Sequence, residues 1–320
     1  MATIDELRSV NLEELLSEGW KTRNDNFPSI LTVSAPGAKT YISDHHRNKR
    51  NSFVNISVTG KACALNCEHC QKNLLQSMIP VTSGDELKAL GESLVAKKCQ
   101  GVLVSGGATA TGEVPLDNYF DAIHHLKELG LKVLVHTGLA TRETARRLKQ
   151  AGADQALLDV IGARETIERV YHLDREPWDF FASMEALTEA GLDVIPHIIV
   201  GLDFGRIVGE YEALEMVTRI KPNTIVIVVL SPLLDTPMEN VVPANAEDVG
   251  RITAIARIVN PNAYLTMGCA RPPGTSKELM ERYAVRAGIT GIAYPIDPTI
   301  EYAKGQGLEV IFKDTCCSLL

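Results

Sequence analysis

Eight short runs of apolar residues, most of them rich in valine, isoleucine and leucine, alternate with longer amphipathic stretches from residue 53 to residue 294. Runs of this length and composition predict buried β-strands, and the stretches between them predict α-helices. The alternation predicts an α/β protein in which crossover helices join parallel strands. The predicted strands are Phe53–Thr59, Gly101–Ser105, Lys132–Thr137, Asp154–Asp159, Asp193–Val200, Thr224–Leu230, Ala263–Met267 and Gly291–Tyr294.

The predicted helices fit the same alternation, and several are followed by glycine, a residue common just after a helix end. Eight βα units within about 250 residues match a closed (βα)8 barrel of the TIM type in number and length. An open, doubly wound sheet is the alternative. The helices are predicted at Asp85–Lys98, Leu116–Leu129, Ala140–Ala151, Pro177–Ala190, Glu210–Ile220, Ala246–Ile258 and Ser276–Ala287.

The barrel region has a flanking segment on each side. We expect residues 1–50 to form an N-terminal extension that begins with a short amphipathic helix and wraps on the barrel. Residues 51–300 would form the barrel, and residues 301–320 a tail that closes its mouth. No linker or change of composition divides the barrel region.

Charge and hydropathy exclude several classes of partner. The net charge of −8 gives no indication of a nucleic acid or an anionic membrane as partner. No apolar run reaches the roughly 18 residues that span a bilayer, and the first 20 residues lack the apolar region of a secretory signal. We therefore expect a cytoplasmic protein. Seven cysteines in such a chain favour metal ligation over disulfides.

Three cysteines form a C-x3-C-x2-C run, Cys63, Cys67 and Cys70, directly after the first predicted strand. The carboxyl end of a barrel strand is where active sites of this fold lie. Three thiolates on one loop can bind three irons of a cubane cluster and leave the fourth iron open. A zinc site with His69 as fourth ligand is the alternative.

This cysteine run and its position resemble the signature of the radical S-adenosylmethionine (SAM) superfamily. The resemblance implies a [4Fe–4S] cluster whose open iron binds SAM. One electron from the cluster then cleaves SAM to methionine and a 5′-deoxyadenosyl radical, which abstracts a hydrogen atom from the substrate. An electron donor such as ferredoxin or flavodoxin is implied as a partner.

The resemblance also implies a set of SAM contacts at other strand ends. A glycine pair lets the backbone approach the SAM amino group, an aspartate accepts from the ribose, and an arginine pairs with the carboxylate. The alternatives are a structural hydrogen bond for the aspartate, a solvated charge for the arginine, and a core role for the histidine of the fifth strand. The candidates are Ser105, Gly106, Gly107, His136, Asp159, Arg175, His197 and Gly201, with His136 a contact of either SAM or the substrate.

A second cysteine group combines Cys269, after the seventh strand, with Cys316 and Cys317 near the end of the sequence. A tail folded over the barrel mouth would bring the three thiols together, and they are candidate ligands of a second iron–sulfur cluster. The alternatives are a buried Cys269 and a reactive or incidental tail pair. Cys99 is expected in the core.

Over nearly its whole length the chain resembles biotin synthase and its relatives, and it is most similar to a subunit of the two-component lipoyl synthase. The resembling segments are Asp159–Gly162, Thr166–Ile167, Val170–Leu173, Pro196–Ile198, Gly268–Pro272 and Cys316–Cys317. The resemblance implies sulfur insertion into an octanoyl chain on a lipoyl carrier protein, with a paralogous radical SAM subunit as partner. A single-cluster enzyme like methylornithine synthase or a hydrogenase maturase is the alternative, and a non-catalytic zinc- or iron-binding module is a third reading.

Overall fold

The computed structural model describes residues 3–319, and its strands form one parallel sheet. The strands are β1 (Ile30–Ser34), β2 (Phe53–Ser57), β3 (Ile79–Pro80), β4 (Gly101–Ser105), β5 (Lys132–His136), β6 (Gln155–Asp159), β7 (Asp193–Val200), β8 (Thr224–Val229), β9 (Tyr264–Met267), β10 (Gly291–Ala293) and β11 (Glu309–Lys313). Their order in the sheet is β11-β1-β10-β9-β8-β7-β6-β5-β4-β2-β3. All eight predicted strands are thus confirmed, with ends that move by at most two residues.

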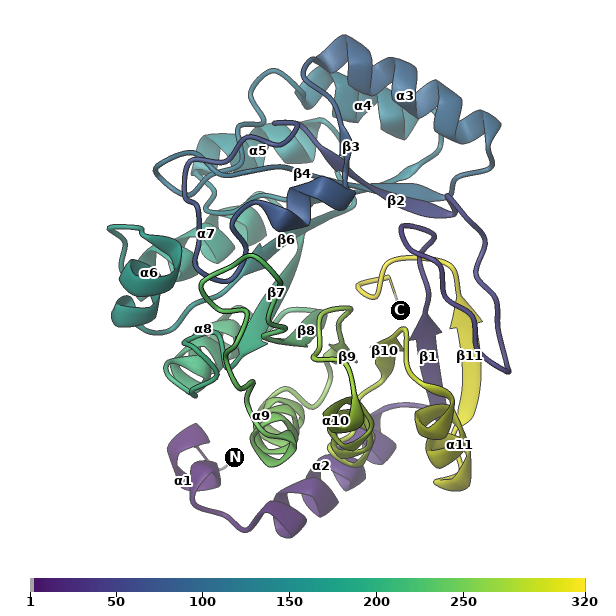
Figure 1. Ribbon diagram of the computed structural model, residues 1–320, viewed down its shortest axis with the longest axis vertical. Coiled ribbons are helices and arrows are strands. Elements are labelled where there is room, and N and C mark those ends of the chain that lie inside the picture. Colours follow the sequence, from purple (N-terminus) through teal and green to yellow (C-terminus); the bar gives the residue numbers. More distant parts are fainter. Residues whose placement is uncertain (1–2, 320) are drawn as a thin grey trace.

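Helices connect the strands and cover the outside of the curved sheet (Figure 1). All seven predicted helices are present, and between residues 3 and 319 none is long and apolar enough to cross a membrane. The helices are α1 (Ile4–Arg8), α2 (Leu12–Asn26), η1 (Asn73–Ser77), α3 (Gly84–Ala96), α4 (Phe120–Glu128), α5 (Arg142–Gln150), α6 (Arg164–Tyr171), α7 (Pro177–Glu189), α8 (Glu210–Ile220), α9 (Ala246–Val259), α10 (Thr275–Arg286) and α11 (Asp297–Gly305).

The predicted α/β fold of the TIM type is confirmed, with one difference in how the sheet ends. Eight strands, β2 and β4 to β10, follow one another in chain order, but β2 and β10 do not pair in the described part of the chain. Strand β2 pairs with the short β3, and β10 pairs with β1, which is followed by β11. The sheet is therefore a half-barrel with three added strands, β1, β3 and β11, and the N-terminal segment contributes β1.

In a closed barrel the first and last strands would pair with each other. In this structure loop 35–52 and the segment after β11 contact each other at that place. Ser52 Oγ donates to the carbonyl oxygen of Asp314 at 2.9 Å. The Asp314 carboxylate accepts from the Lys49 backbone N–H at 3.0 Å and lies 2.7 Å from Nε2 of His46. Side-chain contacts thus replace backbone pairing at this edge.

The tail enters the interior of the half-barrel instead of only covering its mouth. Cys317 is buried among interior residues such as Leu134, Leu157 and Ile195. Ser318 Oγ donates to Oε1 of Gln155, at the start of β6, at 2.7 Å. Figure 1 shows the segment after β11, drawn in yellow, within the curve of the sheet. The interior has room for this segment because the sheet does not close on itself.

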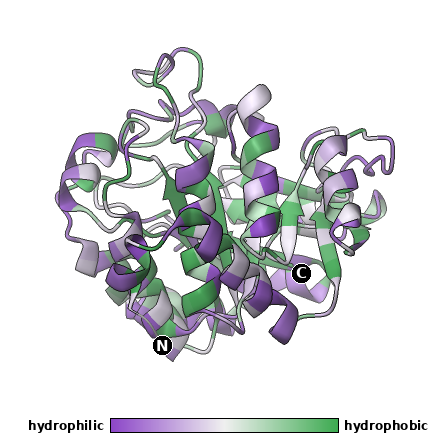
Figure 2. Cartoon of the chain, turned by 90° about the horizontal axis from the view of Figure 1, so that it is seen from below, coloured by the Kyte–Doolittle hydropathy of each residue, from purple (hydrophilic) through white to green (hydrophobic). Residues whose placement is uncertain are grey.

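Hydrophobic residues concentrate on the strands, whereas the surrounding helices also carry hydrophilic residues (Figure 2). Strand β8 is buried at all six positions, as expected for a parallel sheet covered on both faces. Outside the sheet, α2 packs closely on α9 and on the end of α10: a Cβ on Gly19 would lie 3.5 Å from Cα of Ala254 in α9 and 2.7 Å from the carbonyl oxygen of Ala287, which follows α10. The expected extension on the outer face is thus a close-packed part of the structure.

Candidate active site

The three cysteines of the C-x3-C-x2-C run lie on the loop that leaves β2, and all three are half-buried. The loop is tightly turned, since the backbone N–H groups of Cys70 and Gln71 both donate to the Cys67 carbonyl at 3.0 Å. Burial, and after it the negative charges of Cys63 and Cys70, raise the pKa of Cys67 to about 12. The three sulfurs are therefore neighbours, and the Cys67 thiolate needs a bound metal to be stable there. This donor set fits an iron–sulfur cluster with one open iron.

The glycine pair after β4 packs directly against this cysteine loop. A Cβ on Gly107 would lie 2.0 Å from the carbonyl oxygen of Ala62 and 2.5 Å from Cβ of Cys63. The Gly107 N–H donates to Oγ1 of Thr59 at 2.7 Å, and the Ala64 N–H donates to the Ala108 carbonyl at 2.8 Å. The loop therefore requires glycine at position 107, whereas contact of the pair with SAM stays a prediction.

Three of the predicted SAM contacts meet inside the half-barrel. His136 ends β5, Asp159 ends β6, and His197 is the register partner of Asp159 on β7. Burial by itself would raise the pKa of Asp159, but the imidazole of His136 and the charges of His197 and His69 lower it to about 2. Burial lowers the pKa of His197 to about 4. Near neutral pH the centre of the group is an ionised carboxylate beside a neutral His197.

Tyr171 connects this group with the cysteine loop. Its hydroxyl donates to Oδ2 of Asp159 at 3.3 Å, and its ring centroid lies 5.2 Å from that of His69, which stands between Cys67 and Cys70. Burial lowers the pKa of His69 to about 4, so this imidazole is neutral. The polar group and the cysteine loop are therefore parts of one site.

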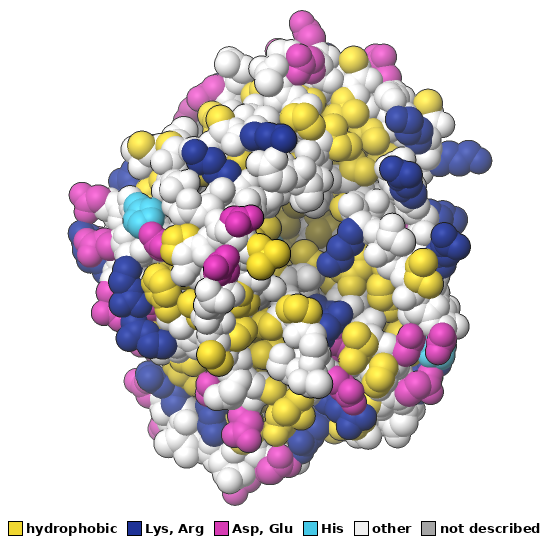
Figure 3. All heavy atoms as spheres, viewed as in Figure 1, with side chains coloured by type: hydrophobic (Ala, Val, Ile, Leu, Met, Phe, Trp, Pro, Cys, Tyr) yellow, Lys and Arg dark blue, Asp and Glu magenta, His cyan; other side chains and the backbone are white. Residues whose placement is uncertain are grey.

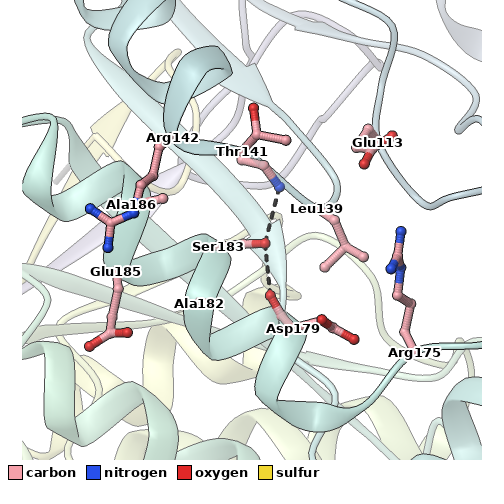
Figure 4. Close-up of a pocket in the computed structure, with 11 residues that line it drawn as sticks. Glu113, Leu139, Thr141, Arg142, Arg175, Asp179, Ala182, Ser183, Glu185 and Ala186 are labelled. Atoms are coloured by element: carbon pink, nitrogen blue, oxygen red, sulfur yellow. Dashed lines mark hydrogen bonds between the residues drawn. The ribbon is translucent and has the colours of Figure 1, made fainter.

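The other predicted SAM contacts lie at separate points around this site. Ser105 Oγ donates to the His136 carbonyl at 3.4 Å, and the Gly201 N–H donates to Oε1 of Glu210 at 2.8 Å. Arg175 lines a pocket of about 300 Å³ between α5 and α7, where its Nε donates to the Thr111 carbonyl at 3.3 Å. Figure 4 shows Glu113 in the same pocket, so this guanidinium faces a carboxylate of the protein itself. Pairing of Arg175 with SAM stays a prediction.

The second cysteine group, Cys269, Cys316 and Cys317, comes together in space, as the sequence predicts. A hydrogen bond from Cys317 and further bonds from Ser318 outweigh burial and lower the pKa of Cys316 to about 6. The pKa of Cys317 is raised well above its usual range. The causes are the hydrogen bond that it donates to Cys316, burial, and the charges of Cys316 and Cys269. Cys317 is affected by both other thiols and Cys269 by the charge of Cys316, so residues 269 and 316–317 lie together despite their distance in sequence.

Arg271 fixes the loop that carries Cys269. Its guanidinium is buried, donates from Nε to Glu281 at 2.9 Å, and donates to the carbonyls of Gly268, Ala293 and Tyr294. Sequence reasoning did not single out this role. The available signal was an arginine two residues after a cysteine at a strand end.

Lys39 lies beside the same thiols. Its ammonium group lies 4.1 Å from the centroid of the Tyr294 ring, and burial together with Arg271 lowers its pKa although Cys269 raises it. A pocket of about 500 Å³ opens here, lined by Lys39, Tyr41, Lys277 and Tyr294 among others. Figure 3 shows a central hollow with hydrophobic side chains around it and basic side chains along one edge. Cys269 is exposed, so the cysteine group is reached from the surface, beside the positive charge of Lys39.

Glu210 is a further residue whose role the sequence did not define. It begins α8, is buried, and accepts the N–H of Gly201 at the turn after β7. Burial raises its pKa to about 7 and outweighs the hydrogen bonds that lower it. Glu210 therefore holds the end of β7, three residues beyond the strand position of His197.

The comparison with known proteins first defines a class. The sequence model of the Radical SAM superfamily matches residues 57–204, which include the cysteine loop, the glycine pair, Asp159 and His197. The predicted resemblance to this superfamily is therefore confirmed over residues 57–204.

Curated relatives point to one group within this superfamily. The chain is 27% identical over 306 residues to a biotin synthase of Ruthia magnifica, covering 91% of this chain and 85% of that protein. It is 25% identical over 255 residues to a biotin synthase of Pseudoalteromonas atlantica, covering 75% of this chain and 65% of that protein, just under two thirds. The predicted likeness to the biotin synthase group is thus confirmed. The closer likeness to a lipoyl synthase subunit stays a prediction.

Solved structures confirm the fold. Methylornithine synthase superposes with a TM-score of 0.65 at 15% identity, over 96% of this chain and 93% of that one. The [FeFe]-hydrogenase maturase HydG superposes with a TM-score of 0.67 at 18% identity, over 96% and 72%. At these identities the likeness concerns the arrangement of the elements alone.

Proposed function

We propose that this protein is a radical SAM enzyme that inserts sulfur into unactivated C–H bonds, with a protein-bound octanoyl chain of lipoyl cofactor biosynthesis as substrate. The observation that carries the proposal is the second group of thiols, Cys269, Cys316 and Cys317, beside a pocket at the open end of the half-barrel. The biotin synthase homologues support sulfur insertion as the reaction type. We place the enzyme in the reducing interior of the cell, where free thiols persist.

In this proposal Cys63, Cys67 and Cys70 hold the [4Fe–4S] cluster. The cluster and SAM supply the electron and the carbon radical that removes a hydrogen atom from an alkyl chain. The protein itself holds the cysteine loop against Gly107 and Thr59, which fixes the three sulfurs on a rigid strand end. Apolar side chains inside the half-barrel keep water from the radical site.

Cys269, Cys316 and Cys317 would hold a second iron–sulfur cluster whose sulfide is the sulfur source. Sulfur must reach a carbon radical that forms inside the barrel, so the donor has to lie on the interior side. The tail carries Cys317 to that side, and Arg271 holds Cys269 at the opposite edge of the group. The pKa of Cys316 is lowered and that of Cys317 is raised, so cluster assembly has to remove the Cys317 proton.

A lipoyl carrier protein, a paralogous radical SAM subunit and a ferredoxin or flavodoxin are the proposed partners. The alternative is a single-cluster mutase or maturase, in which the second thiol group carries no iron. The two readings differ in iron content, because the alternative needs only the cluster on Cys63, Cys67 and Cys70.

The test is iron and acid-labile sulfide per chain with Mössbauer spectra after anaerobic reconstitution. The wild type is compared with two variants, one lacking the thiols of Cys63, Cys67 and Cys70 and one lacking those of Cys269, Cys316 and Cys317. We expect about eight irons in the wild type and about four in each variant if both are cubanes. About four irons in the wild type and in the second variant would refute sulfur insertion from a resident cluster.

A further inference from the structure

Loop 35–52, between β1 and β2, has a positive charge that the mechanism does not use. It contains one acidic residue and four cationic ones, Lys39, Arg47, Lys49 and Arg50. Four positive charges and one negative charge give the loop +3, whereas the whole chain has −8. Arg47, Lys49 and Arg50 are exposed, and Figure 1 shows the loop on the open side of the sheet. The loop is therefore a basic region on a molecule of negative net charge.

The acidic side chains that contact the loop bind its histidines and its backbone instead of its cations. Asp314 Oδ1 lies 2.7 Å from Nε2 of His46, and Glu301 Oε1 lies 2.7 Å from Nε2 of His45. Asp297 accepts a backbone N–H of the loop at 3.1 Å. Within residues 3–319 none of the four cationic side chains of the loop forms an ion pair. Their charges are thus free to meet a partner.

Asn48 holds the backbone of the loop in one shape. Its Nδ2 donates to the carbonyls of Ala35 at 3.0 Å and of Lys39 at 2.8 Å. Its Oδ1 accepts the Tyr41 N–H at 3.0 Å. A surface that is already ordered loses less conformational entropy on binding than a flexible one. The loop therefore presents its side chains from a fixed backbone.

An exposed apolar side chain and a pocket lie beside these cations. Ile42 is 64% exposed and forms an isolated β-bridge with Arg47. It also lines the pocket of about 500 Å³ to which Lys39 and Tyr294 contribute. Cys269 raises the pKa of Lys39, so the second cysteine group lies next to the same pocket. Apolar contact area bordered by polar and charged groups is the usual composition of a protein–protein interface.

We propose that the cationic side chains of loop 35–52 and the exposed Ile42 dock an acidic protein domain that carries the alkyl chain of the substrate on a lysine. The acidic character follows from charge complementarity, because unpaired cations attract a negative surface and speed its association. The identity of the partner as the carrier rests on the proposed function, in which the alkyl chain has to reach the second cysteine group beside this loop. An electron donor is the competing occupant, and it has to deliver its electron to the first cysteine loop instead.

The test is the association rate of an octanoylated lipoyl carrier protein with the whole enzyme, measured by surface plasmon resonance. At about 0.1 M salt the Debye length is about 10 Å, so mainly charges near the contact act. A triple variant with Arg47→Ser, Lys49→Ser and Arg50→Ser should associate about 10-fold more slowly than the wild type. At about 1 M salt, where the Debye length is about 3 Å, the difference should disappear. Circular dichroism checks that the variant is folded.

A matched control and a second measurement keep the test specific to this loop. Lys21→Ser, Arg219→Ser and Lys221→Ser together remove the same charge from exposed positions on α2 and at the end of α8, and this variant should keep the wild-type rate. Carbodiimide joins carboxylates to lysine amines, and it needs no variant. In the wild type it should link acidic residues of the carrier to Lys39 or Lys49.

Equal losses of rate in the two triple variants would overturn the proposal, as would cross-links that avoid Lys39 and Lys49. If the loop variant loses association with flavodoxin but keeps that with the carrier, the loop binds the electron donor and the proposal fails. A wild type that does not bind the carrier would refute both the docking surface and the proposed substrate. Iron content tests the second cluster separately, because docking of the carrier needs no cluster.

Discussion

Replacement of Gly107 by alanine is the sharpest test of how the cysteine loop is held. Gly107 lies so close to the loop that an added Cβ would sit 2.0 Å from the Ala62 carbonyl oxygen and 2.7 Å from Cα of Cys63. Both neighbours are at or next to backbone, so a side-chain rotation cannot relieve the contact. The loop itself has to move.

The size of the effect follows from these distances. Non-bonded heavy atoms normally lie about 3.5 Å apart, so residues 62–63 must retreat by about 1 Å or more. Overpacking of this kind costs about 1–3 kcal/mol of unfolding free energy. A displacement of about 1 Å at a reacting group costs about 100-fold in rate. We therefore expect reductive SAM cleavage by Gly107→Ala to fall about 100-fold.

The assay is formation of 5′-deoxyadenosine from SAM with excess dithionite, together with iron content. Two matched variants define the scale. The three atoms nearest to a Cβ on Gly106 belong to the side chains of Thr59 and Val58, at 3.1 Å or more, so Gly106→Ala should lose less than about 10-fold. Gly305→Ala meets nothing within 4 Å and should match the wild type. Wild-type SAM cleavage by Gly107→Ala would show that the loop is not held as described.

Three further predictions concern other parts of the molecule. Arg271→Met leaves Glu281 buried without its main partner, so the free energy of unfolding should be about 3–5 kcal/mol lower than that of the wild type. An unchanged midpoint of denaturant unfolding would contradict this. The pKa of Glu210 is raised to about 7 in the folded state, so its contribution to stability is full below its ordinary value of 4.5 and lost as pH rises through 7. The stability of the wild type relative to Glu210→Gln should fall over that range in thermal melts, and a flat difference would place the carboxyl in water. In cluster-free protein the pKa of Cys316 is about 6 and that of Cys317 well above its usual range, so iodoacetamide should label Cys316 first with a midpoint near pH 6; equal labelling rates by mass spectrometry would refute this order.

The strands were predictable because each core strand is a short run of β-branched and apolar residues between turn signals. Strand β1 (Ile30–Ser34) has the same composition but stands outside the βα alternation, so the sequence gives no reason to place it in the sheet. Its position depends on parallel pairing with β10 and β11, which lie more than 250 residues away. Long-range pairing of this kind cannot be recognised from local pattern.

The residues of the site also differ in whether the local sequence predicts them. Cys63, Cys67 and Cys70 were predictable because their spacing is local and specific. That His136, Asp159 and His197 meet follows from the strand order once the fold is assumed. That their side-chain nitrogen and oxygen atoms lie within 4.8 Å of one another does not. The roles of Arg271 and Glu210 depend on carbonyl and N–H groups of distant segments, so only the structure reveals them.

The two cysteine groups differ in how much of the chain must be folded before they exist. The first lies on one loop next to β2 and β4, whose contacts span about 50 residues. The second needs residues 269 and 316–317 to meet, with the tail anchored to loop 35–52 and to β6. Because contacts that close long loops form late in folding, the first group can receive metal on a partly folded chain and the second cannot. Maturation of the protein should therefore be ordered, and metal at the second group would mark chains whose sheet is complete.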